Sequence, residues 1–336
     1  MAIPAPRPTA APLPLRPALV DLERELEQHR PALTGYCYRM LGSPFDAEDA
    51  VQETMVRAWR ALDRFEGRAA LRTWLFGIAT NVCIDLINAG RRRALPMDLG
   101  APASATAPAG DRLPEATWVG PALDERVGVA GGDPAEAAVA RDGIRVAFVA
   151  ALQHLPARQR AVLILRDVLR WRADEVAALL DMTTVAVHSM LRRARSALAD
   201  AHAGVTAPLV PPEEARAVVE RYVDAFQRLD MDLLVRLLRD DATLDMPPHP
   251  LWLQGAEAIA AWFRVHLEPC HEHRYRPVAV NGTAGLVMYR PEAPGAAPVP
   301  FGVQAIEVAE GGIVAVHAFL EPALFPLFGL PATPDG

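Results

Sequence analysis

The stretch RADEVAALLDMTTVAVHSMLRRAR, from Arg172 to Arg195, contains two short amphipathic helical patterns separated by the segment 181–184. The apolar positions of the first pattern are Val176, Leu179 and Leu180, and those of the second are Val185, Val187, Leu191 and Leu198. Two helices joined by so short a turn are typical of a helix-turn-helix. The alternative is a solvated helical hairpin inside an all-helical core.

The second helix of this stretch has a basic polar face. Thr183 or Thr184 can cap its first turn with a hydroxyl group. The exposed polar residues are His188, Ser189, Arg192, Arg193 and Arg195. With no acidic side chain among them, this face suits phosphates and base edges of DNA. Motifs upstream decide between DNA binding and the hairpin alternative.

The composition limits the class of protein. A chain of 336 residues with 51% hydrophobic residues predicts two or three domains with buried cores. The net charge is -7, so a nucleic-acid-binding surface must be local. Cys37, Cys83 and Cys270 are far apart and form no metal-ligand spacing, so we expect no disulfide, metal or cofactor and a reducing cytoplasm. Residues 1–18 are interrupted by prolines and predict a disordered leader, not a signal peptide or membrane span.

Three helical segments precede the first linker, over residues 19–41, 44–65 and 71–89. The second starts with Ser43 as a cap, Pro44 at the first helical position and acidic residues in the first turn. Its periodicity predicts one buried face, formed by Ala47, Val51, Met55, Ala58, Trp59 and Leu62. The arginines 91–93 after the third helix either favour the helix dipole or contact phosphates.

The rest of the chain alternates linkers and folded parts. Residues 94–132 are rich in Pro, Ala and Gly with mostly acidic charges, which predicts a flexible linker, either simply solvated or lying in a channel built for nucleic acid. A helical module over 133–204 and a short linker over 205–212 follow. Residues 213–330 predict an α+β domain in which one long helix precedes a curved antiparallel sheet, and Glu310-Gly311-Gly312 predicts a hairpin.

Three collinear motifs resemble a known family. The strings DAEDAVQETMVRAWR (46–60), LRTWLFGIATNVCIDLINAGRRR (71–93) and LPARQRAVLILRDVL (155–169), with the helix-turn-helix, are similar to the extracytoplasmic-function group of sigma-70-class sigma factors. The C-terminal domain resembles the SnoaL-like branch of the nuclear transport factor 2-like fold. The resemblance implies two all-α sigma domains, region 2 over 19–93 and region 4 over 133–204, plus an α+β cone-shaped domain over 213–330.

The resemblance implies an alternative sigma factor, not an enzyme. Such a factor binds core RNA polymerase through the β′ coiled-coil and the β flap, recognises the minus-35 and minus-10 promoter elements and initiates transcription. It acts in the bacterial cytoplasm, at the nucleoid through polymerase, with no membrane contact. One departure from the family pattern is Asp181, which stands where the turn of the helix-turn-helix often has glycine. Asp visits the left-handed conformation more readily than most residues, so the turn is retained.

The resemblance also implies roles for individual residues. The residues expected to bind core polymerase are Asp49, Gln52, Glu53, Val56, Arg57 and Arg60. Those expected at minus-10 DNA are Phe65, Arg68, Arg72, Trp74, Asn81, Arg91, Arg92 and Arg93, although Trp74 also has the spacing of a core residue. Those expected at minus-35 DNA are Thr184, Val185, Ala186, His188, Ser189, Arg192, Arg193 and Arg195.

For the C-terminal domain we expect a role in modulating activity, with an unknown small molecule as a further candidate partner. The candidate pocket residues are Tyr222, Phe226, Asp245, His249, Trp252 and His317. The apolar tail, with Leu324, Phe325, Leu327 and Phe328, could contact region 2 or close the domain's own sheet. Two other functions remain open: a ligand-sensing helix-turn-helix regulator acting without polymerase, and a cyclase, for which no catalytic pair has a defining spacing.

Overall fold

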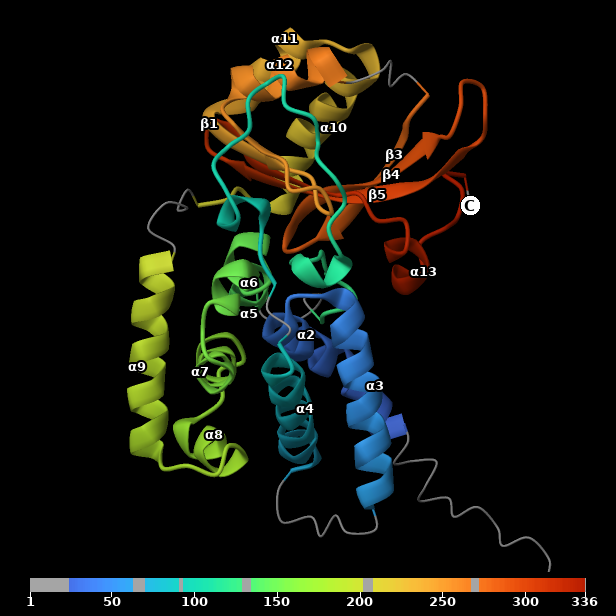
Figure 1. Cartoon of the computed structure of the whole chain (residues 1–336). Coiled ribbons are helices and arrows are strands. Elements are labelled where there is room, and N and C mark those ends of the chain that lie inside the picture. Colours follow the sequence, from blue (N-terminus) through green and yellow to red (C-terminus); the bar gives the residue numbers. More distant parts are fainter. Residues whose placement is uncertain are drawn as a thin grey trace, which may run out of the picture.

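The computed structural model describes residues 24–62, 70–90, 93–128, 134–201, 208–266 and 272–335. The described chain has a helical half and a half built on a six-stranded sheet, stacked one on the other (Figure 1). The interface between the halves has an apolar part, because Val303, Ala305 and Phe319 of the sheet belong to the same buried cluster as the helical half. The two halves therefore form one body in this conformation.

The first helical module contains α2 (Arg30–Leu41), α3 (Pro44–Ala61) and α4 (Leu71–Asn88). Pro31 lies in the first turn of α2, where a missing backbone N–H removes no hydrogen bond within the helix. The predicted cap of α3 is also confirmed, because the Ser43 hydroxyl accepts a hydrogen bond from the backbone N–H of Asp46. Tyr36 and Phe76 are fully buried, with ring centroids 5.2 Å apart, and join α2 to α4.

The second helical module contains the helix-turn-helix. Its elements are α5 (Pro134–Asp142), α6 (Val146–Gln153), α7 (Ala157–Leu163), the π-helical turn η4 (Ile164–Val168), α8 (Ala173–Leu179) and α9 (Thr184–Ala201). Asp181 between α8 and α9 has φ of 49°, so the left-handed conformation expected of this residue is confirmed. Thr183 supplies the cap, accepting a hydrogen bond from the N–H of Ala186 at 3.2 Å.

The linker predicted to be flexible covers residues 94–132, and its described part, 94–128, follows a defined course over the C-terminal domain (Figure 1). It includes the short 3-10 turns η2 (Pro96–Asp98) and η3 (Glu115–Thr117). The N–H of Ala103 donates to the carbonyl of Trp252 at 2.8 Å, and the N–H of Leu113 donates to the carbonyl of Pro248 at 2.9 Å. Composition alone pointed to flexibility because these partners are far away in the sequence.

The C-terminal domain begins with two helices, α10 (Pro212–Arg228) and α11 (Met231–Leu237), where the sequence predicted one. The prediction of a single helix was wrong because Leu229 adopts a left-handed conformation, with φ of 55°, and ends α10. Asp230 then caps α11 by accepting a hydrogen bond from the N–H of Leu233. The break turns α11 back over the sheet.

The sheet has the strand order β2-β1-β6-β5-β4-β3. Its strands are β1 (Leu238–Asp245), β2 (Trp252–Gln254), β3 (Arg274–Val280), β4 (Thr283–Pro291), β5 (Pro298–Ala309) and β6 (Gly312–Phe319), with α12 (Ala256–His266) after β2 and α13 (Leu324–Phe328) at the end. The prediction of a purely antiparallel sheet was wrong, because β1 and β6 pair in parallel. The predicted β5–β6 hairpin is confirmed by the pairing of Ala309 with Gly312.

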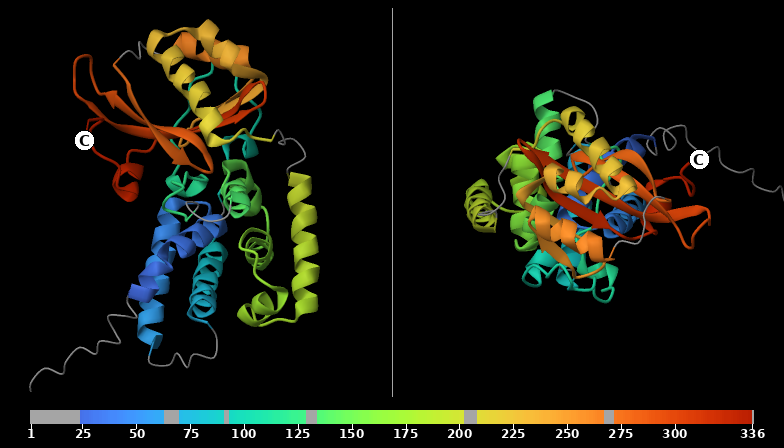
Figure 2. Two further views of the ribbon diagram at one scale, coloured as in Figure 1. Left: turned by 180° about the vertical axis from the view of Figure 1, so that it is seen from behind. Right: turned by 90° about the horizontal axis from the view of Figure 1, so that it is seen from above.

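The two faces of the sheet pack against different partners. Helices α10, α11 and α12 cover one face, and the helical modules lie beneath the other (Figure 2). Side chains alternate along each strand, so neighbouring residues point to opposite faces. Leu244 and Ala318 belong to the cluster under α10–α12, whereas Phe319 belongs to the cluster shared with the helical modules.

Candidate nucleic-acid interface

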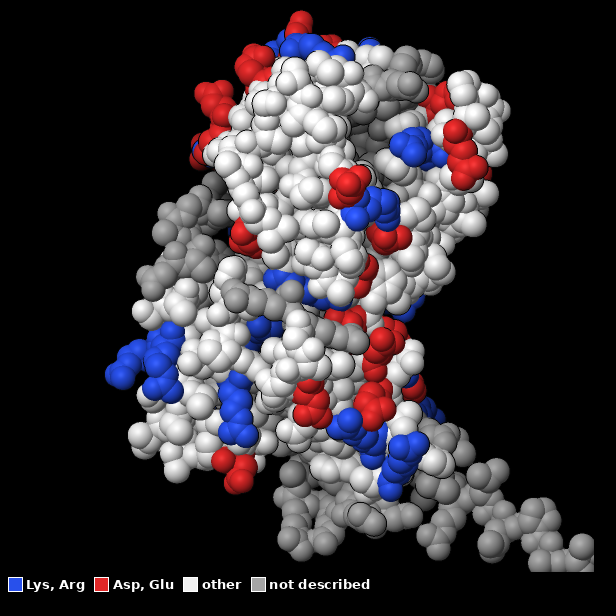
Figure 3. Space-filling model, in the orientation of Figure 1, with Lys and Arg blue, Asp and Glu red and all other residues white. Residues whose placement is uncertain are grey.

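The predicted docking face of α3 lies at the surface. Figure 3 shows acidic side chains gathered over the first turns of α3 and basic ones near its end. Of the six predicted residues, Asp49, Gln52, Val56, Arg57 and Arg60 are exposed, and Glu53 is half-buried. The Arg57 guanidinium pairs with Glu53 at 2.7 Å. The face therefore offers charged groups around a small apolar centre.

Trp59 enlarges that apolar centre. The sequence predicted Trp59 in the buried face, but 60% of this side chain is exposed. Ala58 next to it is fully buried, and a step of one residue turns a helix by about 100°. Trp59 instead shares the surface with Val56, one turn earlier, which is 41% exposed. An exposed tryptophan beside an exposed valine was missed because its spacing from Met55 also fitted the core.

The predicted minus-10 residues on α4 divide into surface and core. Arg72 and Asn81 are exposed, whereas Trp74 is half-buried and packs against the main core. The Arg72 guanidinium lies over the Trp171 ring, 5.1 Å from its centroid, and so contacts the second module. Phe65, Arg68, Arg91 and Arg92 lie outside the described residues.

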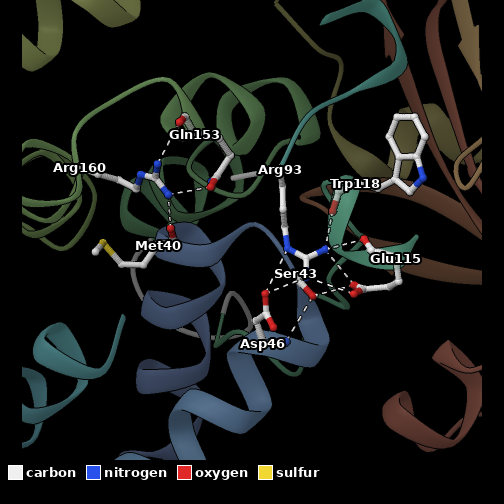
Figure 4. A network of polar contacts seen from close by, with 8 residues as sticks. All are labelled: Met40, Ser43, Asp46, Arg93, Glu115, Trp118, Gln153 and Arg160. Carbon is white, nitrogen blue, oxygen red and sulfur yellow. Dashed lines mark hydrogen bonds and ion pairs between the residues drawn. The ribbon is translucent and has the colours of Figure 1, made fainter. Parts of the chain in front are cut away.

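Arg93 has a different role from the one predicted. Its side chain is 1% exposed and pairs with Asp46 at 2.7 Å and with Glu115 at 2.9 Å (Figure 4). It also donates to the backbone carbonyl of Trp118 at 2.7 Å. The predicted DNA contact of Arg93 is therefore wrong for this conformation, because the guanidinium is enclosed by carboxylates. Arg93 ties the start of α3 to the linker.

The recognition face of α9 is accessible. Arginine side chains gather over α9 at the edge of the molecule (Figure 3). Of the predicted residues, Thr184, Val185, His188, Arg192, Arg193 and Arg195 are exposed, whereas Ala186 and Ser189 are half-buried. Val185 is 76% exposed, so it belongs to this face and not to the core. Arg195 differs from the others, because it pairs with Asp167 of η4 at 2.6 Å.

The two helical modules are joined by a buried arginine. Arg160 on α7 is 1% exposed. It donates to the carbonyl of Met40 at the end of α2 and, at 2.6 Å, to the side chain of Gln153 (Figure 4). Helix α4 also contacts α7 and α8, the first helix of the helix-turn-helix. The two predicted DNA-reading parts are thus packed together.

One residue of the β3–β4 turn contacts three other parts of the chain. The fully buried Asn281 amide donates to the Tyr38 hydroxyl and to the Ile144 carbonyl, both at 2.6 Å, and accepts from the N–H of Ala122 at 3.0 Å. We call this set the Asn281 junction. Sequence reasoning missed it, although Asn281-Gly282 between two strands is a turn signal. Asn281 has φ of 53°, which suits Asn better than most residues.

A buried ionic group lies beside this junction. Arg145, just before α6, pairs with Glu307 of β5 at 2.9 Å. His317 lies 2.6 Å from Asp245, and both side chains are buried. Burial lowers the pKa of His317, but Asp245 and Glu307 raise it, and the resulting pKa lies above the ordinary value. These charges therefore belong to the contact between the sheet and the second module.

The linker contributes another buried carboxyl group. Asp124 accepts a hydrogen bond from the N–H of Gly282 at 2.8 Å. Burial raises the pKa of Asp124 to about 6, although that hydrogen bond and Arg141 favour the charged form.

The predicted pocket residues do not share one cavity. A cavity of about 200 Å³ lies between the sheet and its covering helices, and Tyr222, Phe226 and His249 line it as predicted. Asp245 and His317 do not line it, because the alternation of β1 and β6 turns them to the opposite face. Trp252 is not among its lining residues either; its indole N–H donates to the carbonyl of Gly100 in the linker at 2.9 Å.

Membrane spans and metal clusters are both missing from the described part of the chain. No helix there is long and apolar enough to cross a membrane. No group of three or more His, Cys, Asp or Glu side chains in the same part is arranged to hold a metal ion.

Family models match all three folded parts. The match to sigma-70 region 2 covers residues 26–93, the match to sigma-70 region 4 covers 145–198, and the match to the SnoaL-like domain covers 219–316.

Individual proteins are similar over most of the chain. The ECF RNA polymerase sigma factor SigG of Mycobacterium tuberculosis H37Rv is 42% identical over 319 residues, which cover 93% of this chain and 84% of SigG. The probable ECF RNA polymerase sigma factor SigI of the same strain is 23% identical, over 88% of this chain and 91% of SigI. The crystal structure of the M. tuberculosis extracytoplasmic function sigma factor SigJ has a similar fold, with a TM-score of 0.59 and 23% identity over 94% of this chain and 100% of that one.

Proposed function

The chain belongs to the extracytoplasmic-function sigma factors of RNA polymerase, and we propose that the conformation described above is a restrained form that must open to read a promoter. As an alternative sigma factor, the protein binds core RNA polymerase, recognises the minus-35 and minus-10 elements and initiates transcription. Its C-terminal SnoaL-like domain is the restraining part in this proposal.

The observation that carries the proposal is the direct contact between the two DNA-reading modules. Elements centred 35 and 10 base pairs upstream are about 25 base pairs apart, or about 85 Å along the duplex. Helix α4 of region 2 touches α8 of region 4, so the closed body cannot place one module on each element. A released linker over 94–132 could extend to about 130 Å, which is long enough to span the distance between the two promoter elements. Opening therefore requires release of the linker.

In this proposal core polymerase can bind the closed form through the exposed face of α3. We assign the contact with the β′ coiled-coil to the α3 face of Asp49, Gln52, Glu53, Val56, Arg57 and Arg60, and we add Trp59. Support comes from the exposure of this face while the linker is docked. An apolar centre within a charged rim is the usual anatomy of a reversible interface. Region 4 would then contact the β flap after opening.

The DNA contacts are assigned to two separate surfaces. For minus-10 DNA the proposal keeps Arg72 and Asn81, with Phe65, Arg68, Arg91 and Arg92 from outside the described residues, and leaves Trp74 as a core residue. For minus-35 DNA it keeps Thr184, Val185, Ala186, His188 and Ser189 as base readers and Arg192, Arg193 and Arg195 as phosphate contacts. Arg195 must first leave Asp167.

The restraint is assigned to contacts that the C-terminal domain makes with both modules. The Asn281 junction joins region 2, region 4 and the linker. The apolar tail adds to it, because Leu324 and Phe328 pack with the sigma core while Phe325 packs on Tyr289 of the domain's own sheet. The proposal requires no catalytic step in this domain, and places the factor with polymerase in the cytoplasm, at the nucleoid.

The test is run-off transcription with purified core polymerase and the Asn281→Gly variant. Glycine keeps the left-handed backbone at residue 281 without strain and keeps the backbone hydrogen bond to the Ala122 carbonyl, while the buried side chain and its hydrogen bonds are lost. We expect more product from a cognate promoter at limiting factor, because the closed form is destabilised relative to the open one. The matched control is Glu292→Gly, which also truncates a side chain to glycine but lies exposed in the β4–β5 loop. Equal or lower product from Asn281→Gly at equal folded concentration would contradict the restraint.

A further inference from the structure

The cavity of the SnoaL-like domain has an aromatic wall. It lies between α10, α12 and the face of the sheet that they cover, and its volume is about 200 Å³. Tyr222, Phe226, Trp262 and Phe263 form one side, with Met288 on the sheet. Phe226 meets Phe263 edge to face at 4.8 Å. Such a wall suits a flat, apolar ligand body.

Two buried polar atoms in this cavity are unsatisfied. The Tyr222 hydroxyl and the Gln304 side-chain oxygen have no hydrogen-bond partner of normal geometry, although the two residues are 1% and 8% exposed. Burial and the neighbouring Tyr275 raise the pKa of Tyr222, and the nearby Gln304 side chain only partly opposes this shift, so the phenol stays protonated and can donate. Leaving a buried polar group unpaired is unfavourable. The phenol and the amide oxygen together fit a ligand hydroxyl, which accepts from one and donates to the other.

Most of the other polar lining groups are basic, the exception being the phenol of Tyr275. Arg290 lies over the Phe301 ring, 4.1 Å from its centroid, and both residues line the cavity. His266 and His273 line it as well. No Asp or Glu among the described residues belongs to the lining. The lining therefore favours an anionic group on the ligand.

The sigma linker closes part of the cavity. Ala109 of the linker is one of the lining residues. On either side of it, the Trp262 indole N–H donates to the carbonyl of Ala107 at 2.8 Å, and the His249 ring nitrogen Nδ1 lies 2.8 Å from the carbonyl of Gly110. Trp262 and His249 also line the cavity. The same side chains thus face the ligand space and hold the linker.

We infer that this cavity binds a small aromatic organic anion carrying a hydroxyl group, and that ligand binding and linker docking stabilise each other. A ligand enclosed beneath Ala109 gains contacts only while the linker is docked, and coupling between two binding events is reciprocal. The ligand would therefore favour the closed form. This regulatory consequence rests on the proposed function, whereas the binding itself does not.

The binding test measures the affinity of three probes for the free full-length protein by titration calorimetry. They are 6-hydroxy-2-naphthoate, 2-naphthoate without the hydroxyl, and 6-hydroxy-2-naphthamide without the charge. We expect the first to bind most tightly. Tyr222→Phe should weaken the hydroxynaphthoate about fivefold to tenfold and leave the naphthoate unchanged. Arg290→Gln should weaken both acids and leave the amide unchanged. No saturable binding of the hydroxynaphthoate up to about 1 mM would overturn the assigned chemistry, as would equal losses for all probes.

The linker test follows hydrogen exchange at the amides of Ala103 and Leu113. Both are bonded to carbonyls of the C-terminal domain, on either side of Ala109. Saturating hydroxynaphthoate should slow their exchange several-fold, and exchange at the Thr54 region of α3 serves as the internal reference. Unchanged or faster exchange at the two linker amides would overturn the coupling. Because polymerase is absent, a failure here is distinct from a failure of the transcription test.

Discussion

Arg93 was predicted to contact DNA, but in the structure it forms buried ion pairs. The sequence placed it in a run of three arginines suited to phosphates, and nothing local indicated that Asp46 and Glu115 would enclose it. Both carboxylates are far from Arg93 in the sequence, so their approach depends on the tertiary fold. The same reason explains why Asn281 was missed and why Asp245 and His317 were assigned to the wrong face. Local spacing identified residue types but not their neighbours.

Arg93→Ala should lower the free energy of unfolding by about 3 kcal/mol, because it removes the buried guanidinium that pairs with Asp46 and Glu115. Urea denaturation measures the change, with Arg158→Ala, an exposed arginine of α7, as the matched control. A loss within about 0.5 kcal/mol, the usual range for surface substitutions, would show that the buried pair does not stabilise this conformation.

Two buried groups should make the closed body more stable in mild acid. In the folded chain Asp124 has a pKa of about 6, above its ordinary value of 3.8. As the pH rises, the unfolded chain therefore loses the Asp124 proton at a lower pH than the folded chain does. The contribution of Asp124 therefore falls as the pH rises from about 4 to about 6, by up to about 3 kcal/mol. The pKa of His317 is also raised, so its contribution is present below 6.5 and is lost at higher pH.

The measurement is the unfolding free energy of the native chain and of Asp124→Asn across this pH range. Asn keeps an acceptor for the Gly282 N–H but cannot ionise. We expect Asp124→Asn to be the more stable protein at pH 7 and the difference to shrink toward pH 4. If the difference in unfolding free energy between the two proteins did not change with pH, ionisation of Asp124 would be excluded as the cause of the pH dependence.

At the scale of elements, the helices were predicted well and the sheet only in part. Caps and periodicity are local signals, so Ser43 and Thr183 marked the starts of α3 and α9 correctly. The parallel pairing of β1 with β6 and the short strand β2 depend on partners far along the chain, which no local pattern shows. The break between α10 and α11 was missed because a leucine in the left-handed conformation has no sequence signal.

On helix α9, substitutions of phosphate-contacting residues should have different effects from substitutions of base-contacting residues. Arg192→Ala with Arg193→Ala should weaken binding of the holoenzyme to all promoter sequences and reduce the slope of log K against log salt by about 2. His188→Ala should change the preferred minus-35 sequence with little effect on that slope. Binding to a library of minus-35 variants measures both effects. The same sequence profile for all these variants would refute the assigned face.

Helix α3 should carry much of the affinity for core polymerase through its apolar centre. Trp59→Ala should weaken core binding at least about tenfold, because aromatic residues at the centre of an interface contribute most. Its thermal stability should stay near that of the native chain, since 60% of the side chain is already in water. Titration of labelled core polymerase gives the affinity, and the exposed Arg158→Ala serves again as control. Unchanged affinity would move the docking site away from this face.

In the whole molecule, a linker whose composition is typical of flexible segments is docked on the C-terminal domain. The linker is hydrogen-bonded to the C-terminal domain at several points, and each module contributes to the Asn281 junction. Many weak contacts that are broken together give a two-state element, which a partner can shift by binding one state better. Core polymerase with promoter DNA would bind the open state.

The most direct test of the restrained form is the distance between the two DNA-reading modules, measured by energy transfer between dyes. Asn88→Cys on α4 and Ser196→Cys on α9 are both exposed, and Cys270→Ser removes a competing thiol; Cys37 and Cys83 are buried. We expect high transfer in the free chain and a fall when core polymerase and promoter DNA are added, with Asn281→Gly lowered already in the free chain. Low transfer in the free native chain, or high transfer that persists in the promoter complex, would contradict the account.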